Sequence, residues 1–447
     1  MSIIPSSDYF SYASCLALLL SIVVRPGCKT HCDGLLHNVD RREAIVWTGL
    51  SSAGIINSLS GINAHALEDV SKIVLPMETC EGGCNCIRFV AENPSGEAAA
   101  YFRAIVDTGS PFLIIPSAQV SDAVLDACFD GEERWWKRLL PRNRLDRQKL
   151  VDDFFPLDPK FPPTVDVYGS QQGNIQWRTV SRIKYRDERL RQLINKDNPS
   201  SLGLTFGVMD DALSDESGGA LVGLVKNWKM DTTKAAVRPS WLEQLEIGNN
   251  SDQENREYHH GIRSFSVDSP RKTLTLSSES LIKGANKSCT MRLADLREWG
   301  DFVDHYACYI KELYIDDFPV YRSGLIPSGR RICIVFDSGL TGCLFTKSLW
   351  DELQQKTGKD LSSLRSVKVD VPTVSGGANA VHSIGSGDGI DKVRNMFYVS
   401  PISLDWFDDD TIAPHIVVLG QAFLSLGELS IDITERKVSF VYDRDVI

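Results

Sequence analysis

The feature that most constrains the fold of this chain is a short pattern that occurs twice. In each copy an apolar run ends in Asp-[Thr/Ser]-Gly, a second apolar run follows, and an apolar pair before Gly comes much later. The copies occupy residues 104–117 with 220–224, and residues 333–346 with 416–421. A single turn of this kind is usually only a β-turn. Two copies in the same order predict a duplicated β unit.

Asp107 and Asp337 are the carboxylates of the two copies. A carboxylate at a strand end followed by Gly is expected to be exposed on a tight turn that another backbone can approach closely. If the copies face each other, two neighbouring carboxyl groups cannot both ionise, so one holds a proton while the other is a base. Such a pair can activate water against an amide, which predicts hydrolysis at these two residues.

Short apolar segments separated by turn residues predict a mostly β protein from Ile87 onward. Helices are the predicted exceptions, and the last of them has apolar residues at helical spacing. These helical exceptions are residues 132–155, 184–194 and 347–356. Residues 214–219 and 376–389 are polar and rich in Gly, and are expected to be loops.

Length and charge limit the class of protein. A chain of 447 residues is expected to fold as more than one lobe. Lys and Arg total 48 against 59 Asp and Glu, and the net charge of −11 does not suit a surface that holds phosphate backbones. We therefore expect no nucleic acid partner. The basic and aromatic segment at residues 131–149 is expected to be a solvated insertion.

An apolar run at residues 13–24 is too short for a membrane span, which needs roughly 20 residues, but has the length of a signal-peptide core. We expect a signal peptide in residues 1–25 and a pro-segment or leader in residues 26–74. The expected location is the secretory pathway, with an extracellular, vacuolar or lysosomal end point. The alternative is a buried apolar helix or strand, because Asp8 and no Lys or Arg precede the run.

Cysteine content agrees with an oxidising compartment. The chain has 11 Cys, and removal of Cys15 with the signal leaves an even number that predicts disulfides of unassigned pairing. Cys80, Cys84 and Cys86 resemble a metal knuckle, but no second ligand pair completes a zinc site. We therefore expect no metal.

With these motifs established, the chain from about Leu75 to its C-terminus resembles the pepsin-like aspartic proteases. Residues 107–110 (DTGS) resemble the first catalytic motif of that family, and residues 336–342 (FDSGLTG) resemble the second. Residues 165–177 resemble the flap hairpin, in which a Tyr-Gly pair closes over the substrate. The family-like segments near the C-terminus, including the closing hairpin at 430–441, occur along the chain in the same order as in that family.

The resemblance implies a bilobal, mostly β, pepsin-like fold with a central cleft that holds an extended peptide, and no metal or organic cofactor. The N-terminal lobe would be residues 75–245 and the C-terminal lobe residues 246–447. The implied activity is that of an aspartic endopeptidase made as a zymogen, a monomer that acts on a peptide or protein substrate. The site residues implied by the match are the catalytic Asp107 and Asp337, the supporting Thr108, Gly109, Ser110, Ser338 and Gly339, and the flap residues Tyr168 and Gly169.

The match also assigns roles to hydroxyl groups. Thr108 and Ser338 occupy positions whose hydroxyls brace the two loops, and Ser110 occupies the position that bonds the first carboxylate. Leu340 stands where the family usually has Thr or Ser. We therefore expect Asp337 to lack a hydroxyl partner and to be the more readily protonated aspartate.

Two alternatives stay open. Ile114 and Gln421 replace the usual flap-anchoring Trp and the common Asp after the late Gly, so the chain can also be a pepsin-fold binding protein or inhibitor with weak or no catalysis. The third reading is a metal or adhesion module at residues 80–86. Retention of both aspartates favours the enzyme.

Overall fold

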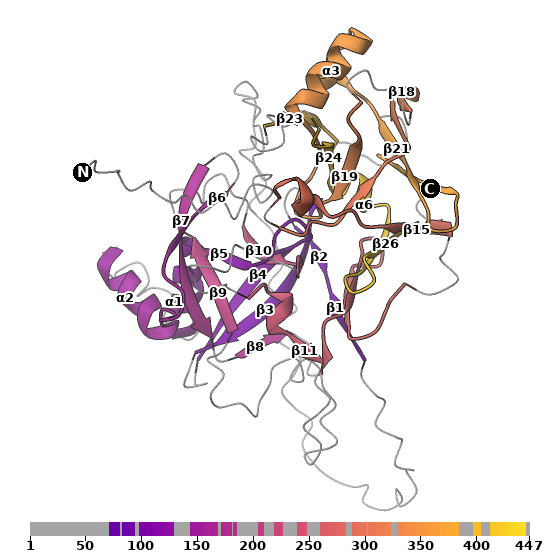
Figure 1. Cartoon of the computed structure of the whole chain (residues 1–447). Helices are drawn as coiled ribbons and strands as arrows, with labels where there is room; N and C mark the ends of the chain where they lie inside the picture. Colours follow the sequence, from indigo (N-terminus) through magenta and orange to yellow (C-terminus); the bar gives the residue numbers. More distant parts are fainter. Residues whose placement is uncertain are drawn as a thin grey trace, which may run out of the picture. The chain divides into compact units, whose positions relative to one another are not determined.

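The structure, a computed structural model, describes residues 71–80, 83–93, 98–128, 144–168, 171–180, 182–185, 204–209, 219–226, 239–247, 260–282, 288–301, 303–322, 329–383, 397–403 and 412–443. The expected signal peptide, almost all of the expected pro-segment and the flap residue Gly169 lie outside these ranges. All described residues belong to one compact unit. Strands predominate among them, which confirms the prediction of a mostly β protein (Figure 1).

The largest sheet is built from the first half of the chain. Its order is β2, β3, β4, β10, β5, β9, β7, β6, and β8 pairs with β3 outside this path. The bounds are β2 Glu78–Thr79, β3 Asn85–Glu92, β4 Ala99–Asp107, β5 Leu113–Pro116, β6 Thr164–Tyr168, β7 Gln171–Val180, β8 Arg182–Tyr185, β9 Leu204–Met209 and β10 Ala220–Gly223.

The described part of the second half contributes most of the other sheets. A six-stranded sheet has the order β1 (Lys72–Pro76), β14 (Thr273–Ser277), β13 (Ser264–Asp268), β25 (Gly427–Asp432), β26 (Lys437–Tyr442), β15 (Thr290–Arg292). A five-stranded sheet has the order β16 (Ala307–Tyr309), β19 (Ile332–Phe336), β24 (His415–Leu419), β20 (Cys343–Thr346), β23 (Val399–Ile402). Smaller sheets pair β18 (Phe318–Arg322), β17 (Glu312–Ile315), β21 (Val367–Pro372) and β22 (Ala378–His382), and β11 (Glu246–Ile247) with β12 (His260–Gly261).

The two sequence copies adopt the same strand arrangement, which confirms the predicted duplication. In the first copy β10 lies between β4, to which it is parallel, and β5, to which it is antiparallel. In the second copy β24 lies in the same way between β19 and β20. Gly223 pairs with Asp107, and the N–H of Asp337 donates to the carbonyl of Leu419 at 3.0 Å. The late apolar segments therefore sit directly beside the aspartates.

Strand β1 begins at Lys72, before residue 75, where the folded region was expected to start. All five of its residues pair with β14, and the buried side chains of Ile73 and Leu75 alternate with exposed ones. This period-two burial is typical of a strand with one face on the core. The boundary expected between residues 74 and 75 therefore falls inside an ordered strand, and the folded part begins at or before Lys72.

The predicted helices have mixed outcomes. Helix α3 (Lys347–Thr357) confirms the prediction at residues 347–356. The helix predicted at 184–194 is wrong at its start, because residues 184 and 185 belong to β8, which pairs with β3; residues 186–194 lie outside the described part. The sequence analysis missed α1 (Ser117–Cys128), which follows β5 as α3 follows β20.

Helix α2 (Arg144–Phe154) forms the second part of the helix predicted at residues 132–155. Val151, Phe154 and Phe155 are buried here, and Phe155 packs edge-on against Phe206 with ring centroids 5.3 Å apart. Residues 147–149, the end of the expected solvated insertion, are exposed, and the apolar residues that follow them tie the helix to the core. No helix in the described ranges is long and apolar enough to cross a membrane.

Candidate active site

Both aspartates lie at equivalent strand ends. Asp107 is the last residue of β4, and Asp337 directly follows β19. Their exposed fractions are only 4% and 3%, so the expectation that these turns are exposed is wrong. Each carboxyl group is covered because the opposite turn packs against it.

The two glycines show how closely the turns approach each other. A methyl group added at Gly109 would lie 2.7 Å from the carboxyl carbon of Asp337, and one at Gly339 would lie 2.7 Å from the carboxyl carbon of Asp107. Any side chain larger than hydrogen would therefore collide with the facing carboxyl group. The turns use Gly because the two aspartates must come within interaction distance.

Backbone N–H groups hold both carboxyl groups in the same way. Gly109 N donates to Asp107 Oδ1 at 2.7 Å, and Gly339 N donates to Asp337 Oδ1 at 2.9 Å. The N–H of Leu340 donates to the main-chain carbonyl of Asp337 at 3.3 Å and also lowers the pKa of the Asp337 carboxyl group. It acts at the position where the side chain of Leu340 offers no hydroxyl.

The environment of Asp337 favours the protonated form of its carboxyl group. Burial raises the pKa of Asp337 well above its usual range, and the charge and hydrogen bond of Asp107 raise it further. The N–H groups of Gly339 and Leu340 act in the opposite direction. The direction agrees with the sequence expectation, but the leading cause is burial rather than a missing hydroxyl.

Thr108 and Ser338 join the two turns by four hydrogen bonds. Thr108 N donates to Ser338 Oγ at 3.0 Å, and Ser338 N donates to Thr108 Oγ1 at 2.9 Å. Thr108 Oγ1 donates to the carbonyl of Phe336 at 2.8 Å, and Ser338 Oγ donates to that of Val106 at 2.7 Å. Both side chains are fully buried. We call this set the cross-brace; it fixes one carboxyl group relative to the other.

Ser110 does not have the partner expected for it. Its Oγ is buried and makes no hydrogen bond within the described part of the chain. The oxygen Oδ1 of Asp107 is instead bonded by the N–H of Gly109. The expected hydroxyl bond to the first carboxylate is therefore not seen.

The segment that resembles a flap is a β-hairpin. Strands β6 and β7 are antiparallel, with Tyr168 paired to Gln171, and β7 continues the sheet by pairing with β9. Trp177 of β7 is buried, and its indole N–H donates to Thr164 Oγ1 at 3.1 Å. The structure thus places the backbone of Tyr168 at the end of a hairpin strand.

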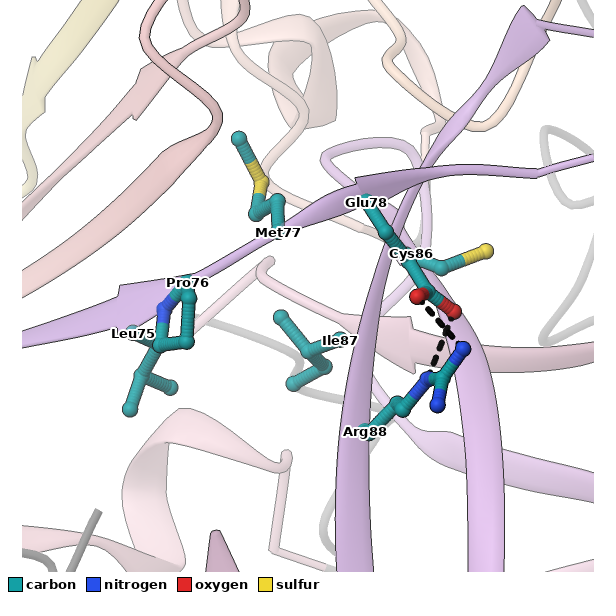
Figure 2. A pocket seen from close by; sticks show the side chains of 7 residues that line it. All are labelled: Leu75, Pro76, Met77, Glu78, Cys86, Ile87 and Arg88. Carbon is teal, nitrogen blue, oxygen red and sulfur yellow. Dashed lines mark hydrogen bonds and ion pairs between the residues drawn. The ribbon is translucent and has the colours of Figure 1, made fainter. Parts of the chain in front are cut away.

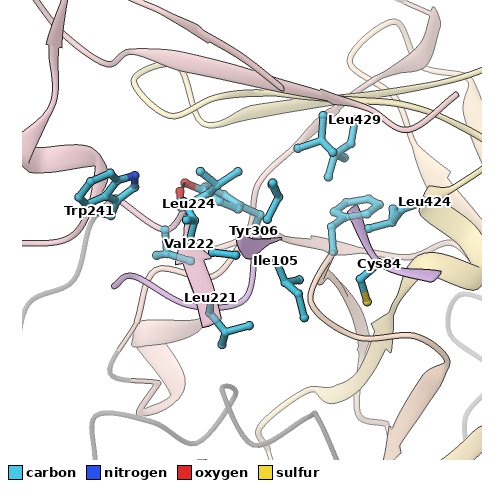
Figure 3. Close-up of a cluster of buried hydrophobic side chains, with 14 of the residues drawn as sticks. Cys84, Ile105, Leu221, Val222, Leu224, Trp241, Tyr306, Leu424 and Leu429 are labelled. Atoms are coloured by element: carbon cyan, nitrogen blue, oxygen red, sulfur yellow. Dashed lines mark hydrogen bonds between the residues drawn. The ribbon is translucent and has the colours of Figure 1, made fainter. Parts of the chain in front are cut away.

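Three site neighbours were missed by the sequence analysis. These are His305, Asp301 and Tyr306. The Nε2 atom of His305 is hydrogen-bonded with the carbonyl of Gly109, and its Nδ1 atom is hydrogen-bonded with Asp301 Oδ2. The hydroxyl of Tyr306 donates to the carbonyl of Leu224 at 2.7 Å within the buried cluster of Figure 3. The sequence carries no spacing signal for these contacts, because His305 and Gly109 are 196 residues apart.

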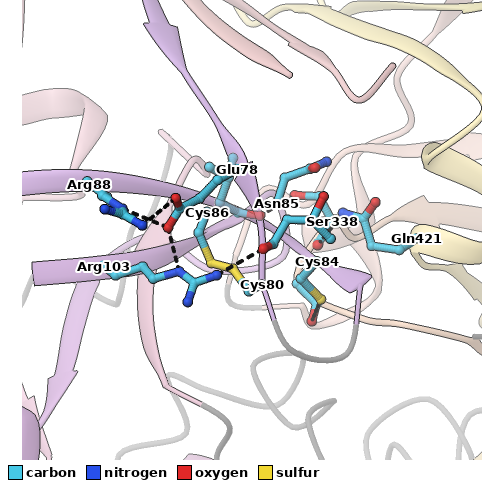
Figure 4. Close-up of a disulfide and its surroundings, with 12 residues drawn as sticks. Glu78, Cys80, Cys84, Asn85, Cys86, Arg88, Arg103, Ser338 and Gln421 are labelled. Carbon is cyan, nitrogen blue, oxygen red and sulfur yellow. Dashed lines mark hydrogen bonds and ion pairs between the residues drawn. A yellow bond between two sulfur atoms is a disulfide. The ribbon is translucent and has the colours of Figure 1, made fainter. Parts of the chain in front are cut away.

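A disulfide joins Cys80 to Cys86 close to the second turn, with Cys84 and Ser338 beside it in Figure 4. The thiol of Cys84 donates to the carbonyl of Gly339 at 3.7 Å, and burial raises its pKa to about 12. The disulfide confirms that this chain forms such bonds and removes two of the three local thiols from metal binding. The free cysteines of the described ranges are Cys84, Cys128, Cys289, Cys308, Cys333 and Cys343.

A pocket of about 180 Å³ lies apart from the aspartates, beside β1 and β3 (Figure 2). The ion pair between Arg88 and Glu78 (2.7 Å) forms part of its wall. The residues that line the pocket are Leu75, Pro76, Met77, Glu78, Cys86, Ile87 and Arg88. None of them is a residue of the two turns.

The geometry joins two carboxyl groups in a buried, braced pair, which is an arrangement suited to general acid–base chemistry. Comparison with models of known protein families finds no match to this chain. Comparison with curated protein sequences finds no match either.

Proposed function

We propose that this protein is an aspartic endopeptidase with a bilobal pepsin-like fold, in which Asp107 is the base and Asp337 the acid. One observation carries the proposal: two Asp-[Thr/Ser]-Gly turns from separate sequence copies face each other so closely that each Gly touches the opposite carboxyl group. A mere pair of β-turns has no need for this contact. The cross-brace between Thr108 and Ser338 supports the same reading.

The proposed reaction follows from the unequal protonation of the pair. A water molecule between the carboxyl groups gives a proton to Asp107 as its oxygen attacks the scissile carbonyl carbon. Asp337 gives its proton to the carbonyl oxygen, and a tetrahedral diol forms. Asp107 then gives its proton to the amide nitrogen, a diol hydroxyl returns a proton to Asp337, and the C–N bond breaks to leave an amine and a carboxylic acid. The substrate is a peptide in extended form, and no metal or organic cofactor takes part.

We further propose that the protein enters the secretory pathway and is processed before the folded region. The disulfide between Cys80 and Cys86 supports an oxidising compartment. The lobes of the proposed fold are those expected from the sequence, and β1 joins the sheet that contains β14. Because β1 pairs fully with β14, processing is expected before Lys72.

Cleavage of denatured globin from strongly acidic to neutral pH tests the proposal. Asp107→Asn and Asp337→Asn should each abolish hydrolysis, with circular dichroism unchanged. Asp351→Asn is the matched control, because this carboxylate lies on the surface of α3 with its side chain 55% exposed. Full activity in either of the first two variants would overturn the proposed function.

The second candidate function is that of a pepsin-fold binding protein with weak or no catalysis. It is favoured by one observation: Ser110 Oγ has no hydrogen bond in the described ranges, and Leu340 has no hydroxyl, so neither carboxylate receives one from these positions. Binding of a statine-type inhibitor without hydrolysis of globin would select this function. Hydrolysis that the inhibitor blocks would select the enzyme.

A further inference from the structure

The imidazole of His305 lies buried between two hydrogen-bond acceptors. Its Nδ1 is 2.7 Å from Asp301 Oδ2, and its Nε2 is 3.1 Å from the carbonyl oxygen of Gly109. The side chains of His305 and Asp301 are only 2% and 3% exposed. A carbonyl oxygen and an ionised carboxylate can only accept hydrogen bonds. A neutral imidazole has one N–H and would direct a lone pair at one of these acceptors, whereas the imidazolium ion satisfies both.

The surrounding charges favour the same protonation state. Burial opposes the charged ring, but Asp301, the carbonyl of Gly109 and Asp107 together outweigh it, and the pKa of His305 is raised. Asp107 at the end of β4 acts in the same direction as Asp301. Arg297, in the turn before Asp301, also interacts with the Asp301 carboxylate and so competes with His305 for it. These are the charged groups that face the ring from its own segment and from the strand packed on it.

Gly109, the hydrogen-bond partner of His305, lies beside both aspartates. Gly109 donates its N–H to Asp107, faces Asp337 so closely that an added methyl group would lie 2.7 Å from the carboxyl carbon, and meets His305 through its carbonyl. The matching carbonyl of the second turn, that of Gly339, meets the neutral thiol of Cys84 instead. The two turns are thus backed by different groups, an imidazole behind the first and a thiol behind the second.

We propose that His305, held by Asp301, is a positioning residue that fixes the first turn and places a positive charge behind Asp107. This inference rests on the proposed function and adds to it a reason for the unequal roles of the aspartates. In the described part of the chain the charge stands behind the first turn alone, because the thiol of Cys84 occupies the equivalent place behind Gly339.

The test compares pH–rate profiles of globin hydrolysis by the full chain and three variants. His305→Gln removes the charge, and Asp301→Asn removes the group that retains it. Both should move the acid limb of kcat/KM to higher pH by about half a unit to one unit, since a nearby cation lowers the pKa of a carboxyl group. The double variant, His305→Gln with Asp301→Asn, should move the acid limb by the same amount as either single variant. Tyr306→Phe is the control, because it deletes the neighbouring hydroxyl bond to Leu224 and leaves the charge in place.

The proposal is overturned if the acid limb stays in place in His305→Gln, or if Tyr306→Phe moves it equally. If the variants fail to fold, nitrogen NMR of the unmodified chain still tests the proposal. At weakly acidic pH the spectrum should show both ring nitrogens of one buried histidine protonated. A single protonated nitrogen at that residue would also overturn it. Lack of any globin hydrolysis by the unmodified chain would refute the proposed function, while the NMR result still decides the charge state of His305.

Discussion

Replacement of Thr108 by Val tests the cross-brace directly. The hydroxyl of Thr108 donates to the carbonyl of Phe336 at 2.8 Å and accepts from the N–H of Ser338 at 2.9 Å. Val keeps the shape of Thr but leaves both of these backbone groups buried without a partner. Each such group costs about 1–3 kcal/mol, so the free energy of unfolding should fall by about 2–6 kcal/mol. Total stabilities are about 5–15 kcal/mol, which makes this a large share.

Urea unfolding followed by tryptophan fluorescence measures the loss, with linear extrapolation to water. Ser110→Ala is a control in the adjacent turn position, since its buried hydroxyl makes no hydrogen bond in the described ranges, and it should change stability by less than about 1 kcal/mol. A double-mutant cycle with Ser338→Ala should give a coupling energy above about 0.5 kcal/mol. Equal losses for Thr108→Val and Ser110→Ala would refute the reasoning.

Three further predictions concern single positions. Gly339→Ala should abolish globin hydrolysis, because the added methyl group would lie 2.7 Å from the carboxyl carbon of Asp107; wild-type rates would contradict the facing turns. Leu340→Thr should lower the pKa of Asp337 and move the alkaline limb of the pH–rate profile down, whereas the apolar Leu340→Val should not; overlapping profiles would show that the backbone N–H donors already suffice. Burial lowers the pKa of His415 to about 3, so the unfolded chain binds the extra proton as pH falls below about 6.5. Urea unfolding should show about 2 kcal/mol lost by pH 5 from this residue, and His415→Gln should remove that slope; an unchanged slope would disprove it.

The duplicated unit was predictable because its signal is local. Each copy combines apolar runs with a turn motif, and both contribute adjacent strands to a sheet. Helix α3 was predictable for the same reason, since Leu349 and Leu353 recur at helical spacing and are buried. Residues 184 and 185 were assigned wrongly because pairing with β3 outweighs local propensity there.

The sequence could not predict that His305 and Cys84 contact the two turns, because these contacts form only in the tertiary structure. His305 and Cys84 bond carbonyl groups that are 196 and 255 residues away. Neither residue stands in a motif with Asp107 or Asp337. The local sequence also gives no hint that the hydroxyl of Ser110 lacks a partner, since the N–H of its neighbour Gly109 already bonds the Asp107 carboxylate.

The cross-brace also determines when during biosynthesis the site can exist. Each of its four bonds joins residues between 228 and 232 positions apart, so none can form until the second copy has been synthesised and folded. Closing so long a loop has an entropic cost that must be met before the contact stabilises anything. A ribosome-bound chain that ends before Asp337 carries one solitary carboxylate and no acid partner. The pair of aspartates is thus assembled late, only in chains whose second copy has been made and has folded against the first.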